Sequence, residues 1–169
     1  MKYAAIFMVI LVLIAGALGI YAYAGVRLQI AGVTLKATAA GERVDEFVAL
    51  QTAVDNGSLA GTAFAESVSG SSAEYSFFTY TFRIKNKGLI KAEMIEVQPV
   101  PVNGDVLSYA TLDETAVNAG VDISGGSERD VWCVLLTSKQ NQDNGVTGRS
   151  FRITYYIWGI PMTVTATYR

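Results

Sequence analysis

Residues 76–86 read SFFTYTFRIKN, and this stretch alternates large apolar side chains with polar ones. The apolar set is Phe78, Tyr80, Phe82 and Ile84, and the polar set is Thr79, Thr81, Arg83 and Lys85. Because successive side chains of a strand point to opposite faces, the alternation predicts a β-strand with one face in a core and the other in water.

The chain that follows predicts further strands separated by turns. Asn86-Lys87-Gly88 has the composition of a turn, and residues 92–98 predict a returning strand that ends at Pro99 and Pro101. Additional strands are predicted over residues 106–112, 131–137, 151–157 and 162–168. The last two form a predicted hairpin, because residues 159–161 read Gly-Ile-Pro.

The chain that precedes residues 76–86 is more mixed. Residues 26–35 predict a strand with a bulge or kink at Ala31-Gly32. A helical stripe of apolar residues predicts one short helix over residues 41–54. Residues 58–73 are rich in Gly, Ser and Ala and predict a loop with at most one short edge strand. Seven or eight strands with one helix are typical of a single antiparallel β-sandwich.

Residues 3–26, YAAIFMVILVLIAGALGIYAYAGV, carry no charged side chain and exceed the ~20 residues that a helix needs to cross a bilayer. Tyr3 and the pair Tyr21 and Tyr23 would stand ~27–30 Å apart on a helix, as interfacial aromatic belts do. The segment therefore predicts an N-terminal transmembrane helix.

This helix divides the chain into a membrane anchor, residues 1–26, and an extracytoplasmic domain, residues 27–169. A cleaved signal peptide is the alternative, because Ala22, Tyr23 and Ala24 form an A-x-A pattern before Gly25. Long domains cross membranes largely regardless of their charge, so we expect a single-pass protein with its C-terminal domain outside the cytoplasm.

The predicted helix also carries small residues at intervals that place them on roughly one face. They are Ala15, Gly19 and Ala22. Small residues let two helices approach closely in lipid, so this candidate helix-packing stripe predicts possible self-association or pairing with another membrane protein.

Residues 80–106, YTFRIKNKGLIKAEMIEVQPVPVNGDV, resemble the strand, N-x-G turn and strand of immunoglobulin-like CARDB modules in prokaryotic surface proteins. Residues 125–127 resemble the Gly-Gly-Ser stretch that often precedes the next core strand of such modules. The resemblance covers residues 75–169, and the helix over residues 41–54 has no place in the simplest module. It implies a single antiparallel immunoglobulin-like β-sandwich with an adhesive, spacer or partner-binding role.

The composition argues against most catalytic chemistry. The chain has no histidine, which removes Ser-His-Asp and Cys-His arrangements and the commonest transition-metal ligand. Signature motifs of hydrolases and phosphate-binding loops are also missing. The acidic pairs Asp45-Glu46 and Asp113-Glu114 are interpreted as ordinary surface acids, and Cys133 as a buried, inert thiol. We therefore expect a non-enzymatic protein without a cofactor.

Two other ligand classes are not expected. A formal net charge of −2 gives no reason to expect a nucleic-acid partner. Oxygen-bearing side chains at Asn141, Asp143 and Asn144, before Gly145, do not match an EF-hand loop and are interpreted as a plain turn, so no metal site is predicted.

Two surface features remain as candidate binding sites. The candidate basic stripe is Arg83, Lys85, Lys87 and Lys91, which would meet anionic lipid headgroups or a wall polymer. Its alternative is a solvated face whose charges pair with Glu93 and Glu96. The candidate aromatic patch is Tyr156 and Trp158, predicted on the face opposite Tyr155; its alternative is that a second layer or the helix covers both rings.

The sequence therefore predicts a non-enzymatic, membrane-anchored extracytoplasmic β-sandwich module that binds a protein partner or forms part of an envelope assembly. One alternative is a module that binds a lipid, a polysaccharide or a small ligand. Another is a pilin-like filament subunit, although the apolar segment lacks the acidic residue of type IV pilins.

Overall fold

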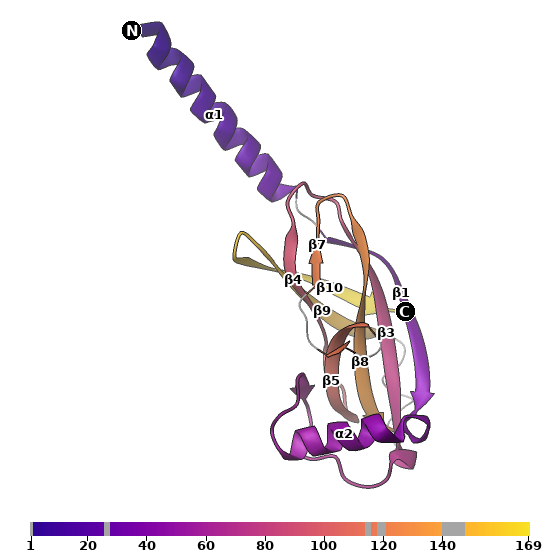
Figure 1. Cartoon of the computed structure of the whole chain (residues 1–169). Helices are drawn as coiled ribbons and strands as arrows, with labels where there is room; N and C mark the ends of the chain where they lie inside the picture. The colour runs from indigo at the N-terminus through magenta and orange to yellow at the C-terminus, as the bar shows by residue number, and fades with distance from the viewer. Residues whose placement is uncertain (1, 26–27, 114–115, 118–120, 140–147) are drawn as a thin grey trace.

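The computed structural model describes residues 2–25, 28–113, 116–117, 121–139 and 148–169 (Figure 1). Its helices are α1 (Lys2–Ala24) and α2 (Val44–Asp55), with short 3-10 turns at Ala40–Glu42 and Ser72–Glu74. The strands are β1 (Leu28–Ala39), β2 (Thr62–Ala63), β3 (Tyr75–Asn86), β4 (Ala92–Pro99), β5 (Asp105–Asp113), β6 (Ala116–Val117), β7 (Val121–Ile123), β8 (Glu128–Ser138), β9 (Arg149–Ile157) and β10 (Ile160–Tyr168).

The strands form two antiparallel sheets. The larger sheet has the order β1-β3-β8-β5-β2, with β6 paired to β5, and the smaller sheet has the order β10-β9-β4-β7. Side chains from both sheets meet in one core, so the predicted mainly-β, antiparallel sandwich is confirmed.

Strand β3 lies inside the larger sheet, between β1 and β8. The predicted apolar face of Phe78, Tyr80, Phe82 and Ile84 is buried, whereas Arg83 is exposed. The face prediction for this strand is therefore confirmed. The bulge predicted near Gly32 is also present, because the β1–β3 register shifts between Ile30 and Gly32.

Aromatic rings fill the space between the sheets. The ring of Phe151 on β9 lies 4.6 Å from Tyr80 and 4.8 Å from Phe82, measured between centroids. Both contacts join β3 to β9, so they tie the larger sheet to the smaller one through the middle of the core.

The helix predicted over residues 41–54 is α2, and it covers the outer face of the larger sheet at the end opposite α1 (Figure 1). Phe47 on α2 is buried beside Tyr75 and Phe77 of β3. The side-chain amide of Gln51 donates a hydrogen bond to the carbonyl oxygen of Val68 at 2.6 Å, which connects the helix to the loop that precedes β3. This end of the larger sheet is therefore buried on both faces.

Two predicted turns differ from the structure. The strand after residues 86–88 is β4, but β4 lies in the smaller sheet, so the chain crosses between sheets instead of forming a hairpin with β3. The turn of the last hairpin is Trp158-Gly159, because Ile160 pairs with Ile157 and already belongs to β10. The predicted plain turn at Asn141, Asp143, Asn144 and Gly145 lies outside the described residues.

Helix α1 leaves the sandwich at one end (Figure 1). The large apolar side chains described along it are between 49% and 88% exposed. Among the residues that the structure describes, no helix is long and apolar enough to cross a membrane, and the predicted transmembrane helix is not supported there.

Candidate functional site

The apical end, as we call the end of the sandwich from which α1 leaves, is built by three connections: residues 87–91, 124–127 and 158–159. Leu28, the first residue of β1, pairs with Asn86, which places the β3–β4 loop beside the exit of α1. Glu93 at the start of β4 lies opposite Tyr156, which brings the tip of the β9–β10 hairpin to the same end.

The β3–β4 loop is held in place by Asn86, whose side chain is buried. Its amide nitrogen donates to the carbonyl oxygens of Ile90 at 2.7 Å and Ile123 at 3.0 Å, and its amide oxygen accepts from Gly88 N at 2.9 Å. A Cβ atom added at Gly125 would lie 2.5 Å from the carbonyl oxygen of Leu89, so only glycine allows the β7–β8 turn to approach this closely. The loop is therefore fixed, yet the Leu89 side chain is 76% exposed.

The hairpin tip also exposes an apolar side chain. Trp158 is 62% exposed, and its φ of +51° lies in the left-handed region, as does the φ of +75° at Gly159. Two consecutive residues with positive φ make the type I′ hairpin turn, in which asparagine and glycine are preferred. A positive φ is unusual for a bulky residue such as tryptophan.

The predicted pairing of Tyr156 and Trp158 on one strand face needs correction. Trp158 lies in the turn, and Tyr156 lies on the outer face of the smaller sheet, half-buried and opposite Pro161 on β10. Trp158 is 62% exposed among the described residues, and α2, which was one expected cover, lies at the other end of the sandwich (Figure 1). Trp158 lies in the turn and not in the strand because the β9–β10 register places the turn one residue earlier than Gly159 and Pro161 suggest.

The candidate basic stripe is partly neutralised. Arg83 forms ion pairs with Asp130 at 3.1 Å and Glu128 at 3.5 Å on β8, and the hydrogen bond to Asp130 raises the pKa of its guanidinium. Of the two predicted partners on β4, Glu93 does pair with a member of the stripe, Lys91, at 2.9 Å, whereas Glu96 accepts a hydrogen bond from Gln98. Arg83 pairs with carboxylates of β8, its neighbour in the larger sheet, because β4 belongs to the other sheet.

Lys91 has a second partner in Asp122, at 3.0 Å. The hydrogen bond to Glu93 raises the pKa of Lys91, and the backbone N–H of Met94 together with Lys91 lowers the pKa of Asp122. Within the described part of the chain, Lys85 and Lys87 have no carboxylate partner. The uncompensated charge of the stripe is therefore confined to these two lysines.

Two of the three small residues in the predicted stripe of α1 can be described. A Cβ atom added at Gly19 would meet nothing within 4 Å, Ala15 is exposed, and the side chain of Ala22 lies outside the described part of the helix. Self-association through this stripe stays a prediction.

Sequence reasoning missed a buried ion pair at the end opposite α1. The guanidinium of Arg149, the first residue of β9, donates to the carboxylate of Asp105, the first residue of β5. The carboxylate also accepts from Val102 N at 2.8 Å and from the Thr137 hydroxyl at 3.3 Å. The pair joins the two sheets. Its members are 44 positions apart in the sequence, so no local pattern predicts their contact.

The buried titratable groups nearby are held neutral. Burial raises the pKa of Tyr80 to about 12, with the positive charge of Arg149 acting in the opposite direction. Burial likewise raises the pKa of the Cys133 thiol to about 12, as its interpretation as an inert thiol requires. No group of three or more acidic, cysteine or histidine side chains that would hold a metal occurs within the described ranges.

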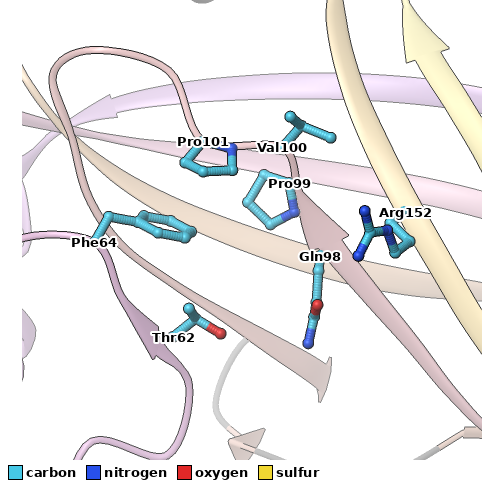
Figure 2. A pocket seen from close by; sticks show the side chains of 7 residues that line it. All are labelled: Thr62, Phe64, Gln98, Pro99, Val100, Pro101 and Arg152. Atoms are coloured by element: carbon cyan, nitrogen blue, oxygen red, sulfur yellow. The ribbon is translucent and has the colours of Figure 1, made fainter.

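A shallow groove lies where β2, β4 and β9 approach one another (Figure 2). It is lined by Thr62, Phe64, Gln98, Pro99, Val100, Pro101 and Arg152. The Phe64 ring faces the two prolines, and the guanidinium of Arg152 lies beyond Gln98 at the other side (Figure 2). The volume of the groove, about 160 Å³, is smaller than the ~300–1,000 Å³ of typical small-molecule sites.

Comparison with known proteins leaves the function open. No family model matches the chain, and no curated protein matches it. A solved FixG-related protein from Vibrio parahaemolyticus is 14% identical, with 54% of this chain and 76% of that chain covered and a TM-score of 0.30. An uncharacterised β-sandwich protein from Clostridium difficile is 10% identical, with 80% and 82% covered and a TM-score of 0.32. Likenesses this weak carry no argument about the site.

Proposed function

We propose that the chain is a non-enzymatic, membrane-anchored module whose β-sandwich stands outside the cytoplasm and binds a protein partner or forms part of an envelope assembly. The observation that carries this proposal is α1, a helix of 23 residues with exposed apolar side chains on every side. A helix that is apolar all round requires an apolar environment, and the sandwich does not supply one.

The 23 residues of α1 overlap almost completely with residues 3–26, which carry no charged side chain. The two natural environments of such a helix are a lipid bilayer and a bundle of like helices. The bilayer is favoured because the uncharged segment has the length of a span and tyrosines at both ends.

Two features support a non-enzymatic role. The groove of Figure 2 is small, and Arg152 is the one ionisable residue among those that line it. The strongly perturbed groups Tyr80 and Cys133 are enclosed in the core, where a substrate would not reach them. These two features therefore support a structural or binding role over a catalytic one.

An immunoglobulin-like topology is part of the proposal. The orders β1-β3-β8-β5 and β10-β9-β4 correspond to the A-B-E-D and G-F-C sheets of a constant-type domain, with β7 added beside β4. In antibody domains a disulfide joins the strands equivalent to β3 and β9, and here the Phe151 contacts with Tyr80 and Phe82 occupy that role. This correspondence supports the CARDB-type resemblance as a hypothesis about fold and partner binding.

Alkaline extraction of membranes tests the anchor. The full chain is expected to stay in the membrane pellet and to dissolve in detergent. A variant with Leu11→Lys and Leu13→Lys should move to the soluble fraction, because each central lysine costs roughly 2.5–3.5 kcal/mol on insertion. The matched control places the same charges on the exposed positions of β10, Thr163→Lys and Thr165→Lys, and should stay in the pellet. A wild-type chain released by alkali contradicts the anchor.

Affinity capture after detergent extraction tests the partner. A protein that is retained by the full chain and lost when the exposed sandwich surface is altered supports the binding module. A filament subunit is the second candidate, favoured by the same exposed α1, whose apolar surface would be buried by helices of other copies. Electron microscopy of surface fractions separates the two, since only the second predicts fibres that contain this chain.

A further inference from the structure

We infer that the apical end of the sandwich rests on the bilayer surface, with Leu89 and Trp158 dipping into the interface and Lys87 facing the lipid headgroups. The inference rests on the proposed function, because α1 as an anchor is what brings the bilayer to this end. It goes further by assigning a lipid-facing surface to the sandwich itself.

The chain length between α1 and the sandwich limits how far the apical end can stand from the membrane. Three residues separate Ala24, the last residue of α1, from Leu28, the first of β1. With consecutive Cα atoms 3.8 Å apart, these ends lie within roughly 15 Å of each other. Figure 1 shows the β3–β4 loop at the end of the sandwich from which α1 leaves, and the β9–β10 hairpin projecting sideways just below that end. The proposed anchor leaves no room for a further domain between this end and lipid.

Hydrogen bonds fix the β3–β4 loop in the conformation that exposes Leu89. Besides the bonds of the Asn86 side chain, the N–H of Gly126 donates to the carbonyl oxygens of Asn86 at 2.9 Å and Gly88 at 3.1 Å. The loop is thus clamped against the β7–β8 turn, and the exposure of Leu89 belongs to a fixed loop. A fixed exposed leucine is costly in water and useful at an apolar boundary.

The hairpin tip carries the second, independent observation. Trp158 occupies a left-handed backbone position in which an asparagine or glycine would be less strained, and the residue is 62% exposed in the two-residue turn. Strain retained at one exposed residue points to a role for that residue. Tryptophan is enriched at membrane–water interfaces because its ring is amphipathic.

The charges around these tips fit headgroups. Arg83 and Lys91 are paired with carboxylates, which leaves Lys87, in the same loop as Leu89, as an exposed cation with no carboxylate partner in the described part of the chain. Apolar tips with an adjacent lysine match an interface of acyl chains and phosphates. A protein partner at this end is the competing occupant, and the experiment is arranged to detect it.

Tryptophan fluorescence of the full-length chain in vesicles tests the inference. The chain has two tryptophans, so Trp132→Phe leaves Trp158 as the reporter and Trp158→Phe leaves Trp132, half-buried in the middle of β8, as the matched control. Each variant is placed in phosphatidylcholine vesicles with and without bromine near the headgroup end of the acyl chains. Brominated lipid is expected to quench Trp158 several-fold more than Trp132.

A second reporter covers the loop. Cys133 is buried, so a Leu89→Cys variant can be labelled selectively with an environment-sensitive fluorophore, with Thr165→Cys on exposed β10 as its control. The label at position 89 should shift to the blue in vesicles, and more so when phosphatidylglycerol is added. The label at position 165 should not shift.

Flotation of the same samples separates the two levels of the proposal. If the chain floats with vesicles but Trp158 is quenched no more than Trp132, the inference is wrong and the anchor stands. If the chain does not float, the proposed anchor fails and the inference fails with it. A label at position 89 that responds in native membranes but not in pure lipid assigns the apical end to a protein partner, which also overturns the inference.

Discussion

At the scale of single residues, the buried polar side chains differ in whether they have hydrogen-bond partners. The side chains of Arg149 and Asp105 are 1% and 0% exposed, and the carboxylate accepts from three donors. The hydroxyl of Tyr80 is equally buried, yet no described group hydrogen-bonds to it. These two situations lead to opposite expectations for mutation.

Replacing Arg149 with alanine should destabilise the fold strongly. The change leaves the Asp105 carboxylate charged and buried without its counter-ion, which costs ~3–5 kcal/mol. Arg83→Ala is the control, because its ion pairs are exposed to solvent and contribute little to stability. Urea unfolding of the two variants measures the difference, and equal midpoints would show that the buried pair is solvated.

Tyr80→Phe should leave stability unchanged or raise it by about 1 kcal/mol. The substitution keeps the ring contacts with Phe151 and removes a buried hydroxyl that has no hydrogen-bond partner. Tyr75→Phe is the matched control and should cost about 1 kcal/mol, since the Tyr75 hydroxyl donates to the Ser69 carbonyl at 2.5 Å. A clear loss in Tyr80→Phe would mean that this hydroxyl is hydrogen-bonded in solution.

Stability should fall as the pH rises from about 9 to about 12. The fold raises the pKa of Cys133 from 9.0 and of Tyr80 from 10.0 to about 12, so the folded chain keeps protons that the unfolded chain releases. This contribution is complete below the unfolded pKa values and disappears as the pH passes through the folded ones, a loss of several kcal/mol. Denaturant titrations across this range check it, and Tyr80→Phe should show a smaller loss above pH 10.

Residue-level prediction from sequence succeeded for alternating burial and failed for long-range pairing. Phe82 and Arg83 could be assigned to opposite faces because the alternation of a strand is local. The Arg149–Asp105 pair could not be found, since either residue reads as an ordinary exposed charge until the two sheets are brought together.

At the scale of elements, β3 and α2 were recognisable because each carries a pattern long enough to define a period, and β8 was recognisable as an unbroken apolar run. Strand β7 was missed, since its three residues are too few to show an alternation. The crossing from β3 to β4 was missed for a different reason. Asn-Lys-Gly serves equally in a hairpin and in a change of sheet, and the choice is made by the buried Asn86 amide, which bonds to β7 as well as to its own loop.

The β9–β10 hairpin should become more stable when its tip is relaxed. Trp158→Asn places a residue that accepts positive φ before Gly159, and we expect a gain of up to about 1 kcal/mol in the free energy of unfolding. The same variant should lose the quenching by brominated lipid expected of Trp158. Thermal melting of the two chains measures the gain, and Thr163→Asn, within β10, should give none. A tip that is destabilised by the change would show that the indole supports the hairpin.

At the scale of the whole molecule, the chain consists of a sandwich and a helix whose described side chains are exposed along its length (Figure 1). The division predicted between residues 26 and 27 falls outside the described residues and stays a prediction. The apical end was not predictable as a unit. Leu89 and Trp158 are 69 positions apart in the numbering, and only the strand registers bring their loops to one end.

The sandwich should fold without α1. Residues 28–169 contain both sheets and the cores on either side of the larger one, so removal of residues 1–26 is expected to leave the melting temperature within a few degrees of that of the full chain in detergent. The truncated chain should also remain in solution. A large drop in melting temperature would mean that α1 contributes packing to the sandwich.

The direct connection from α1 to β1 also determines how the protein responds to mechanical force. Strand β1 begins at the apical end, runs away from it and is hydrogen-bonded to β3 along its length. A load that pulls the far end of the sandwich away from an anchored α1 therefore acts parallel to β1, at right angles to its ladder of hydrogen bonds. Those bonds are strained together in shear and must break nearly at once, whereas a sideways pull would open them one by one from Leu28. Under the proposed anchor, the joint is strong along the axis in which the sandwich would be stretched.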